Sequence, residues 1–345
     1  MNRKLLALAV GAALSLPLAV QAAPTVYGQL NLSVDMVDLE SVDGDALTPG
    51  IQSTDNWQVN SNSSRLGIMG EEALGNGLSA VYKAEWAVAG DQAGGNDLTG
   101  RDRYLGLKGS FGTVKLGAYD SPFKSSQGMV DQFNDMTFTD MGTFITGENR
   151  MNNLIGYESP KIADAINVKV AIQPGESNNN DGPAEAISAA VAYEAGGLYV
   201  ALGLDMDAAD GNFSEPDARD AVRLSASYTM DNLQLGALLQ TSEASNNTAA
   251  STAAGNNFDE QALLLSAGFA MGKIGIRGQF IMANDDFEGA DEQETMALEV
   301  GYDYNFTKMT RAFAEVAFAT TDNLGGVSGQ DADDTVLTVG MQTKF

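Results

Sequence analysis

The chain contains no histidine and no cysteine. Without histidine, Ser-His-Asp and Cys-His catalysis and imidazole-based metal sites are excluded. Without cysteine, no disulfide can stabilise the fold even in an oxidising compartment, so packing and backbone pairing must suffice. No paired carboxylate motif stands out as another catalytic centre, and we therefore predict that the protein is not an enzyme.

Positive charge is also scarce, because 19 Lys and Arg residues are set against 46 Asp and Glu residues, which gives a formal net charge of −27. A nucleic acid is excluded as a partner, since its phosphates require a basic surface. Acidic sequences that are poor in aromatic residues can be disordered. Here the acidic residues cluster between regularly patterned apolar segments, which argues for an ordered fold.

The one long hydrophobic run lies at the N-terminus. Arg3 and Lys4 form a positive start, an apolar stretch follows, and Val20 and Ala22 occupy the two positions that a signal peptidase reads. This pattern predicts a secretory signal peptide over residues 1–22 that is cleaved after Ala22.

The remaining residues, 23–345, are treated as a single domain because no linker or change of composition divides them. Cleavage leaves 323 of the 345 residues and removes two positive charges, so the formal net charge changes from −27 to −29. No run of 18 apolar residues follows residue 22, and a membrane-spanning helix is therefore excluded.

This domain alternates between apolar and polar residues with a period of two. In the segment 26–35, the apolar positions are Val26, Leu30, Leu32 and Val34, and the polar positions are Tyr27, Gln29, Asn31, Ser33 and Asp35. The same alternation recurs in the segments 198–205, 296–303 and 337–345. Because successive strand side chains point to opposite faces, each segment predicts a strand with one apolar and one polar face.

The connections between these segments are alternately short and long. Short turns occur at 110–112, 195–197, 230–232 and 271–273. The long polar connections are 37–59, 90–100, 120–149, 174–183, 206–218, 242–258, 284–292 and 321–333. These eight long loops predict eight hairpins and thus 16 antiparallel strands, each of about 10 residues if it crosses a membrane at a tilt.

A soluble β-sandwich would alternate in the same way. Short turns at one end and long loops at the other are instead typical of an outer-membrane barrel, and closure of the barrel satisfies every backbone polar group in lipid. We therefore predict an all-β fold, a 16-stranded antiparallel transmembrane β-barrel.

Three segments and the C-terminus resemble the general diffusion porins of Gram-negative bacteria. The segments 64–72, 77–86 and 101–117 resemble the second to fifth strands of that family, and the terminal Phe345 resembles the signal read by the barrel assembly machinery. The resemblance implies a homotrimer of barrels in the outer membrane, in contact with its lipid and lipopolysaccharide. It also implies that the long third loop, 120–149, folds into each pore.

In this family, basic side chains on the barrel wall face acidic side chains on the third loop, and rings of charge of this kind set ion preference. The basic candidates are Arg65, Lys83, Arg101, Arg103, Lys115 and Arg150. The acidic candidates on the loop are Asp120, Asp131, Asp135, Asp140 and Glu148, and Glu85 is a further pore-facing candidate. The alternation places Arg65, Lys83 and Lys115 on the polar face of their strands.

The alternation does not decide which face of the strand Arg101 and Arg103 occupy. If Leu105 and Leu107 face lipid, both arginines share their face, whereas both point into the pore if Tyr104 faces lipid. A charge in the middle of the lipid face costs about 2–4 kcal/mol. We therefore expect a pore-facing or an interfacial position for both.

The predicted function is a water-filled channel for the passive diffusion of ions and small hydrophilic solutes. We expect cation preference, because the mature chain is strongly acidic and Ala118 stands where family members often carry another wall arginine. The alternatives are a substrate-specific outer-membrane channel and, less favoured, a non-conducting structural or adhesive barrel, which commonly has about eight strands.

No cofactor is expected. Acidic clusters at 205–210, 285–286 and 331–334 contain the oxygen ligands that hard cations prefer, but none follows the twelve-residue calcium loop. At most, we expect loosely bound divalent cations at these loops, and a solvated acidic vestibule is the simpler interpretation.

Overall fold

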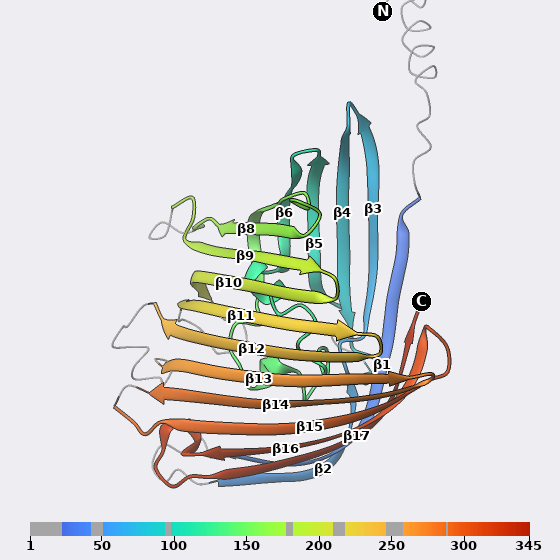
Figure 1. Cartoon of the computed structure of the whole chain (residues 1–345). Coiled ribbons are helices and arrows are strands. Elements are labelled where there is room, and N and C mark those ends of the chain that lie inside the picture. The colour runs from blue at the N-terminus through green and yellow to red at the C-terminus, as the bar shows by residue number, and fades with distance from the viewer. Residues whose placement is uncertain are drawn as a thin grey trace, which may run out of the picture.

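The computed structural model describes residues 23–42, 51–93, 98–176, 182–209, 218–245, 258–287 and 289–345, and Figure 1 shows its strands arranged as a barrel. The predicted signal peptide, residues 1–22, lies outside the described residues. The described strands are β1 (Thr25–Val42), β2 (Ile51–Ser61), β3 (Arg65–Gly75), β4 (Leu78–Val88), β5 (Leu98–Gly109), β6 (Gly112–Asp120), β7 (Arg150–Glu158), β8 (Ile166–Gln173), β9 (Ala186–Ala195), β10 (Leu198–Ala209), β11 (Ala218–Met230), β12 (Leu233–Ala244), β13 (Phe258–Met271), β14 (Ile274–Phe287), β15 (Gln293–Asn305), β16 (Thr310–Asp322) and β17 (Ala332–Lys344). The short helices are α2 (Pro122–Ser125), η1 (Met141–Thr143) and η2 (Leu324–Gly326).

The seventeen strands described here form a closed barrel of 16, because β2 and β3 together make one interrupted spanning strand. Both pair antiparallel with β1: Leu32 faces Ser61 of β2, and Gln29 faces Arg65 of β3. The three residues between β2 and β3 include Ser63, whose φ of 48° breaks the extended backbone. The predicted 16-stranded antiparallel barrel is thus confirmed.

Strand β1 closes the ring by pairing with β17 on its other edge, where Leu32 lies opposite Met341. The pairing continues to the last residue: Gly28 N–H donates to the Phe345 carbonyl at 3.0 Å, and Phe345 N–H donates to the Gly28 carbonyl at 3.1 Å. A Cβ at residue 28 would lie 2.5 Å from the Phe345 ring. Glycine is therefore required for the C-terminal ring to cover the seam.

The alternation of apolar and polar residues decides which face of each strand forms the outside of the barrel and which lines its interior. In β1, Leu30 and Val34 are 42% and 47% exposed, whereas Asn31 and Asp35 are 1% exposed. The apolar residues form the outer surface, and the polar residues line the interior, as a barrel in lipid requires. No helix among the described residues is long and apolar enough to cross a membrane.

The connection between β6 and β7, residues 121–149, lies inside the ring of strands (Figure 1), and we call it L3. Val130, Met141 and Ile145 of L3 pack with Leu238 and Leu264 of the inner wall, and all five side chains are fully buried. The wall that L3 packs against carries small residues, among them Ala262, Ala283 and Gly236, and a Cβ at residue 236 would lie 3.2 Å from Val130 of the loop. This apolar contact holds L3 against one side of the barrel and leaves the other side for the lumen.

Candidate functional site: a charged constriction between L3 and the barrel wall

A cavity of about 440 Å³ lies inside the barrel between L3 and strands β3, β4 and β5. Its charged lining includes Arg65 from β3, Lys83 and Glu85 from β4, Arg101 and Asp102 from β5, Asp120 at the end of β6 and Asp135 at the tip of L3. Together with Arg150 at the start of β7, we call these residues the constriction cluster.

Asp135 at the tip of L3 reaches the barrel wall. Its carboxylate lies 2.8 Å from Arg65 Nη1 and 3.8 Å from Arg101 Nη2. The residue has a φ of 72°, in the left-handed region that aspartate tolerates better than most residues. Its N–H donates to Asp140 Oδ2 at 2.7 Å. This bond turns the loop so that the Asp135 carboxylate faces the wall.

Glu85 is the centre of the wall and is only 4% exposed. It accepts hydrogen bonds of 2.7 Å from Tyr27 Oη and from Arg101 Nε, and its carboxylate lies 3.4 Å from Lys83 Nζ. The carboxylate therefore fixes the directions of two basic side chains and lowers the net positive charge of the wall.

Asp102 links the rest of the constriction cluster. It lies 2.9 Å from Lys83 Nζ and 2.9 Å from Arg150 Nε, and Arg150 Nη2 in turn lies 2.7 Å from Asp120. Every basic side chain of the cluster thus has a carboxylate partner. The cluster holds Arg65, Lys83, Arg101 and Arg150 against Glu85, Asp102, Asp120 and Asp135, so its formal charges cancel.

A β-bulge explains why Arg101 and Asp102 both reach the pore. The register between β4 and β5 shifts at Glu85, so that two residues of β5 lie opposite one residue of β4. A bulge of this kind re-aims side chains. Beyond it, Arg103 is exposed on the same face as Leu105, which is 63% exposed. The expectation that both arginines share one face is therefore corrected: Arg101 points inward, and Arg103 points outward.

Asp131 and Asp140 do not face the basic wall, contrary to expectation. Asp131 accepts hydrogen bonds from the N–H groups of Phe133 and Met141 at 2.8 and 3.1 Å, and Asp140 accepts from Gly142 at the start of η1 at 2.9 Å. Burial raises the pKa of both carboxyls above the usual aspartate range. Their contacts are local to the loop, so both residues maintain the shape of L3.

Glu148 also has a partner other than the predicted wall. Its carboxylate lies 2.7 Å from Arg223 Nη1 on β11 and 3.7 Å from Lys124 Nζ on L3. Arg223 is fully buried, with its guanidinium 4.4 Å from the centre of the Phe123 ring. Sequence reasoning missed Arg223, although Val222 and Leu224 on either side of it show the alternation that points it inward.

Lys115 points inward but lies apart from the constriction cluster. Its Nζ is 4.3 Å from the centre of the Tyr119 ring and 5.1 Å from that of Tyr104. Among the described residues it forms no ion pair, and it lines a different cavity near the short turns.

Asn62, in the break between β2 and β3, holds the tip of L3 and was not predicted. Its side-chain oxygen accepts hydrogen bonds from Thr137 N–H at 3.1 Å and from Thr137 Oγ1 at 2.7 Å. Its amide nitrogen donates to Ser33 Oγ at 2.8 Å. The polar run that interrupts the alternation at residues 62–64 was the signal available in the sequence.

Metal binding finds no support in the part of the chain that the structure describes. No group of three or more acidic side chains there is arranged to hold a metal ion. Asp210, one member of the acidic cluster at 205–210, lies outside the described residues.

A closed antiparallel barrel with an apolar exterior, a polar interior and a charged constriction formed by an inward loop defines an outer-membrane pore protein. The sequence matches the Gram-negative porin family over residues 7–324, and the chain belongs to that family. Its location is accordingly the outer membrane of a Gram-negative bacterium.

Individual relatives agree with this assignment. Outer membrane porin protein 32 of Delftia acidovorans is 26% identical over 340 residues, which cover 92% of this chain and 89% of the relative. A solved structure of an anion-selective porin from Comamonas acidovorans is 24% identical, with a TM-score of 0.73 over 94% of this chain and 99% of that one. The trimer form of OmpT from Vibrio cholerae is 18% identical, with a TM-score of 0.64 over 94% and 100% of the two chains. These likenesses to solved structures carry the fold, and members of the family are channels rather than enzymes.

Proposed function

We propose that this porin is a passive diffusion channel for ions and small hydrophilic solutes and that it prefers cations. The observation that carries the preference is the position of the charges. Within the constriction cluster, four basic and four acidic side chains pair with one another, so the narrow part favours neither sign of ion.

The loops around the mouth carry charge of one sign. Apart from the third, the seven long loops recognised in the sequence contain Asp and Glu but no Lys or Arg. A mouth of one sign concentrates counter-ions. Because exposed charges are screened beyond about 8–10 Å at physiological salt, the cation preference is expected to be larger at low salt.

The solved structure described as anion-selective has the same fold, but the fold does not determine selectivity. Ion preference depends on the particular charges at the mouth and constriction. We therefore base the preference of this chain on its own residues.

The test is the reversal potential of purified protein in a planar bilayer under a KCl gradient. We expect the sign of cation preference, with a larger magnitude at about 0.05 M than at about 1 M salt. Anion preference at the lower concentration would overturn the proposed selectivity while leaving the channel intact. A protein that forms no ohmic channel would overturn the proposed diffusion function itself.

Homotrimeric assembly, contact with lipopolysaccharide and recognition of Phe345 during barrel assembly belong to the same proposal. The support is family membership together with the related fold whose structure is described as a trimer form.

A further inference from the structure

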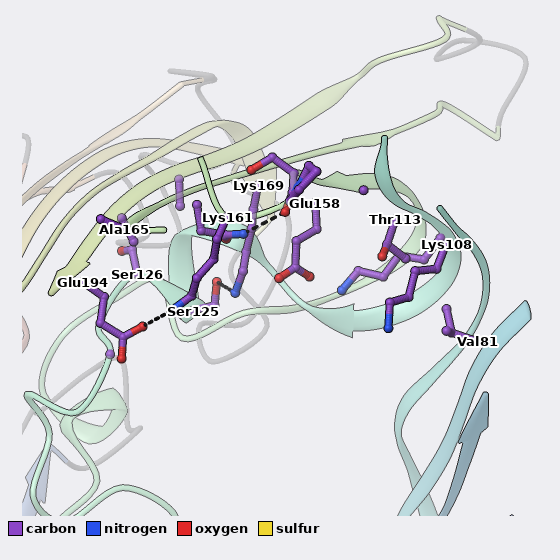
Figure 2. A pocket seen from close by; sticks show the side chains of 18 of the residues that line it. Val81, Lys108, Thr113, Ser125, Ser126, Glu158, Lys161, Ala165, Lys169 and Glu194 are labelled. Carbon is purple, nitrogen blue, oxygen red and sulfur yellow. Dashed lines mark hydrogen bonds and ion pairs between the residues drawn. The ribbon is translucent and has the colours of Figure 1, made fainter. Parts of the chain in front are cut away.

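A second cavity, of about 710 Å³, lies at the end of the barrel where the short turns are. Its lining comes from the turns between β5 and β6 and between β7 and β8, from the last residues of β9, and from residues 125–128 of L3. None of the charged residues of the constriction cluster lines it. Figure 2 shows its side chains pointing toward a common space. We call it the lysine cavity.

Four lysines line this cavity, and they fall into two pairs. Lys108 lies 2.9 Å from Glu71, and Lys161 lies 3.0 Å from Glu194, which Figure 2 marks with a dashed line. These two side chains are 50% and 55% exposed. Their charges are already paired and largely in solvent, so each adds little to binding.

Lys115 and Lys169 form the other pair. Within the described part of the chain, neither has a carboxylate at ion-pair distance. Lys115 stands over the rings of Tyr104 and Tyr119, and Lys169 Nζ donates to Ser125 Oγ at 3.3 Å. An ammonium group has three donors. Both lysines therefore keep donors for a further acceptor, and an oxyanion is the acceptor that suits two cations.

We propose that the lysine cavity binds small oxyanions, through a phosphate or carboxylate group held between Lys115 and Lys169. The hydroxyl of Thr113 lines the same cavity and supplies a further donor. Ser125 Oγ also lines it, but its hydrogen is already donated to the Pro122 carbonyl at 2.8 Å, so it serves to hold Lys169. Glu158 is the one carboxylate that faces this pair without an ion-pair partner among the described residues, and it limits the net positive charge at the pair to one.

The lysine cavity gives a solute a second charged region to pass after the constriction. A solute that has passed L3 toward the short turns meets a cavity with the opposite charge to the acidic mouth. This inference rests on the proposed diffusion function, because a solute must enter the lumen to reach the cavity.

The test uses single channels of the full mature protein in a planar bilayer at constant ionic strength. Inorganic phosphate and, separately, succinate replace chloride in steps, and the conductance and current noise are recorded. We expect a saturable change with at least one probe, and the probe that saturates at the lower concentration identifies the preferred group. The double variant K115Q/K169Q is expected to raise the half-saturating concentration at least tenfold.

Two further variants separate binding at this pair from a general effect of charge. K108Q/K161Q removes the same two charges from the same cavity and is expected to shift half-saturation less than threefold. E158Q removes the opposing carboxylate and is expected to lower the half-saturating concentration. Because the shift expected for E158Q is opposite in direction to that for K115Q/K169Q, the proposal can still be tested if K115Q/K169Q fails to assemble.

Absence of saturation with both probes in a channel that conducts KCl normally would overturn the oxyanion site but not the diffusion function. Equal shifts in the two double variants would also overturn it, because they would reflect net charge alone. Loss of KCl conductance in the wild-type protein would instead overturn the proposed diffusion function.

Discussion

At the scale of single residues, the ion pair between Arg65 and Asp135 connects the barrel wall to the tip of L3. Asp135 is held in the left-handed region by the bond from its N–H to Asp140. The two side chains are 22% and 23% exposed, so they are accessible from the lumen. A charge at such a position acts on passing ions with less screening than a charge on an outer loop.

Substitution of this pair is expected to change ion preference in opposite directions. D135N removes a lumenal carboxylate and leaves Arg65 and Arg101 with less compensation, so cation preference should fall. R65S removes a cation and should raise it. The measurement is the reversal potential at low salt. We expect it to change by roughly several millivolts in each direction, because a single charge acts strongly on ions that pass close to it in a narrow pore.

The matched control for D135N is D131N. It makes the same Asp-to-Asn substitution in the same loop, but Asp131 is 8% exposed, is bonded to L3 backbone N–H groups and favours its protonated form, so little charge is lost. The reversal potential should therefore change less than in D135N. Equal changes in the two variants would show that position relative to the lumen does not matter.

At the scale of elements, L3 is fixed to the wall by apolar packing and by the break between β2 and β3. N62A is expected to loosen the loop tip, because it removes the acceptor of both bonds from Thr137 and the donor to Ser33. Loss of such buried partners costs about 1–3 kcal/mol. Single-channel recordings should show more current noise and more frequent brief closures.

N60A is the control for N62A. Asn60 is close in sequence and bonds to Asp35 inside the barrel. That bond does not involve L3, so the current noise of N60A should match the wild type. An N62A channel as quiet as the wild type would contradict the role of Asn62 in holding the loop.

The packing of L3 should also depend on pH. Burial raises the pKa of Asp131 and Asp140, so the folded loop favours their protonated forms. The stabilisation is therefore fully present below the ordinary carboxyl pKa of about 4 and is lost as the pH rises through the raised values.

Hydrogen exchange measures this effect. The backbone amides of Phe133 and Met141 should show greater protection near pH 5 than near pH 8, after correction for the intrinsic exchange rate. D131N, which cannot ionise at this position, should flatten the difference. If protection in the wild type does not vary with pH, ionisation of Asp131 and Asp140 does not control the packing of L3.

At the scale of the whole molecule, the outer surface is apolar around the seam between β1 and β17. Val26 is 61% exposed and Val339 is 65% exposed in the single chain. We predict that native mass measurement in mild detergent will find three copies. A strictly monomeric species with full conductance would contradict the trimer.

The sequence by itself determined the architecture and the direction of most side chains. A barrel in lipid must satisfy every backbone group and present an apolar exterior, so the alternation of residues such as Leu30 and Asn31 has only one solution. The count of long loops then set the number of strands at 16, as observed. Arg65, Lys83 and Lys115 lie on the inner face, as the alternation within their own strands predicts.

Only the tertiary structure decided how the charges of the pore are arranged. One extra residue in β5 reverses the alternation, which is why Arg101 and Arg103 lie on opposite sides of the wall. A loop lacks the two-residue repeat of a strand, so the sequence does not indicate which way a loop carboxylate points. Asp131 turns into L3 and Asp135 turns to the wall because of hydrogen bonds and ion pairs that exist only once L3 is folded inside the barrel.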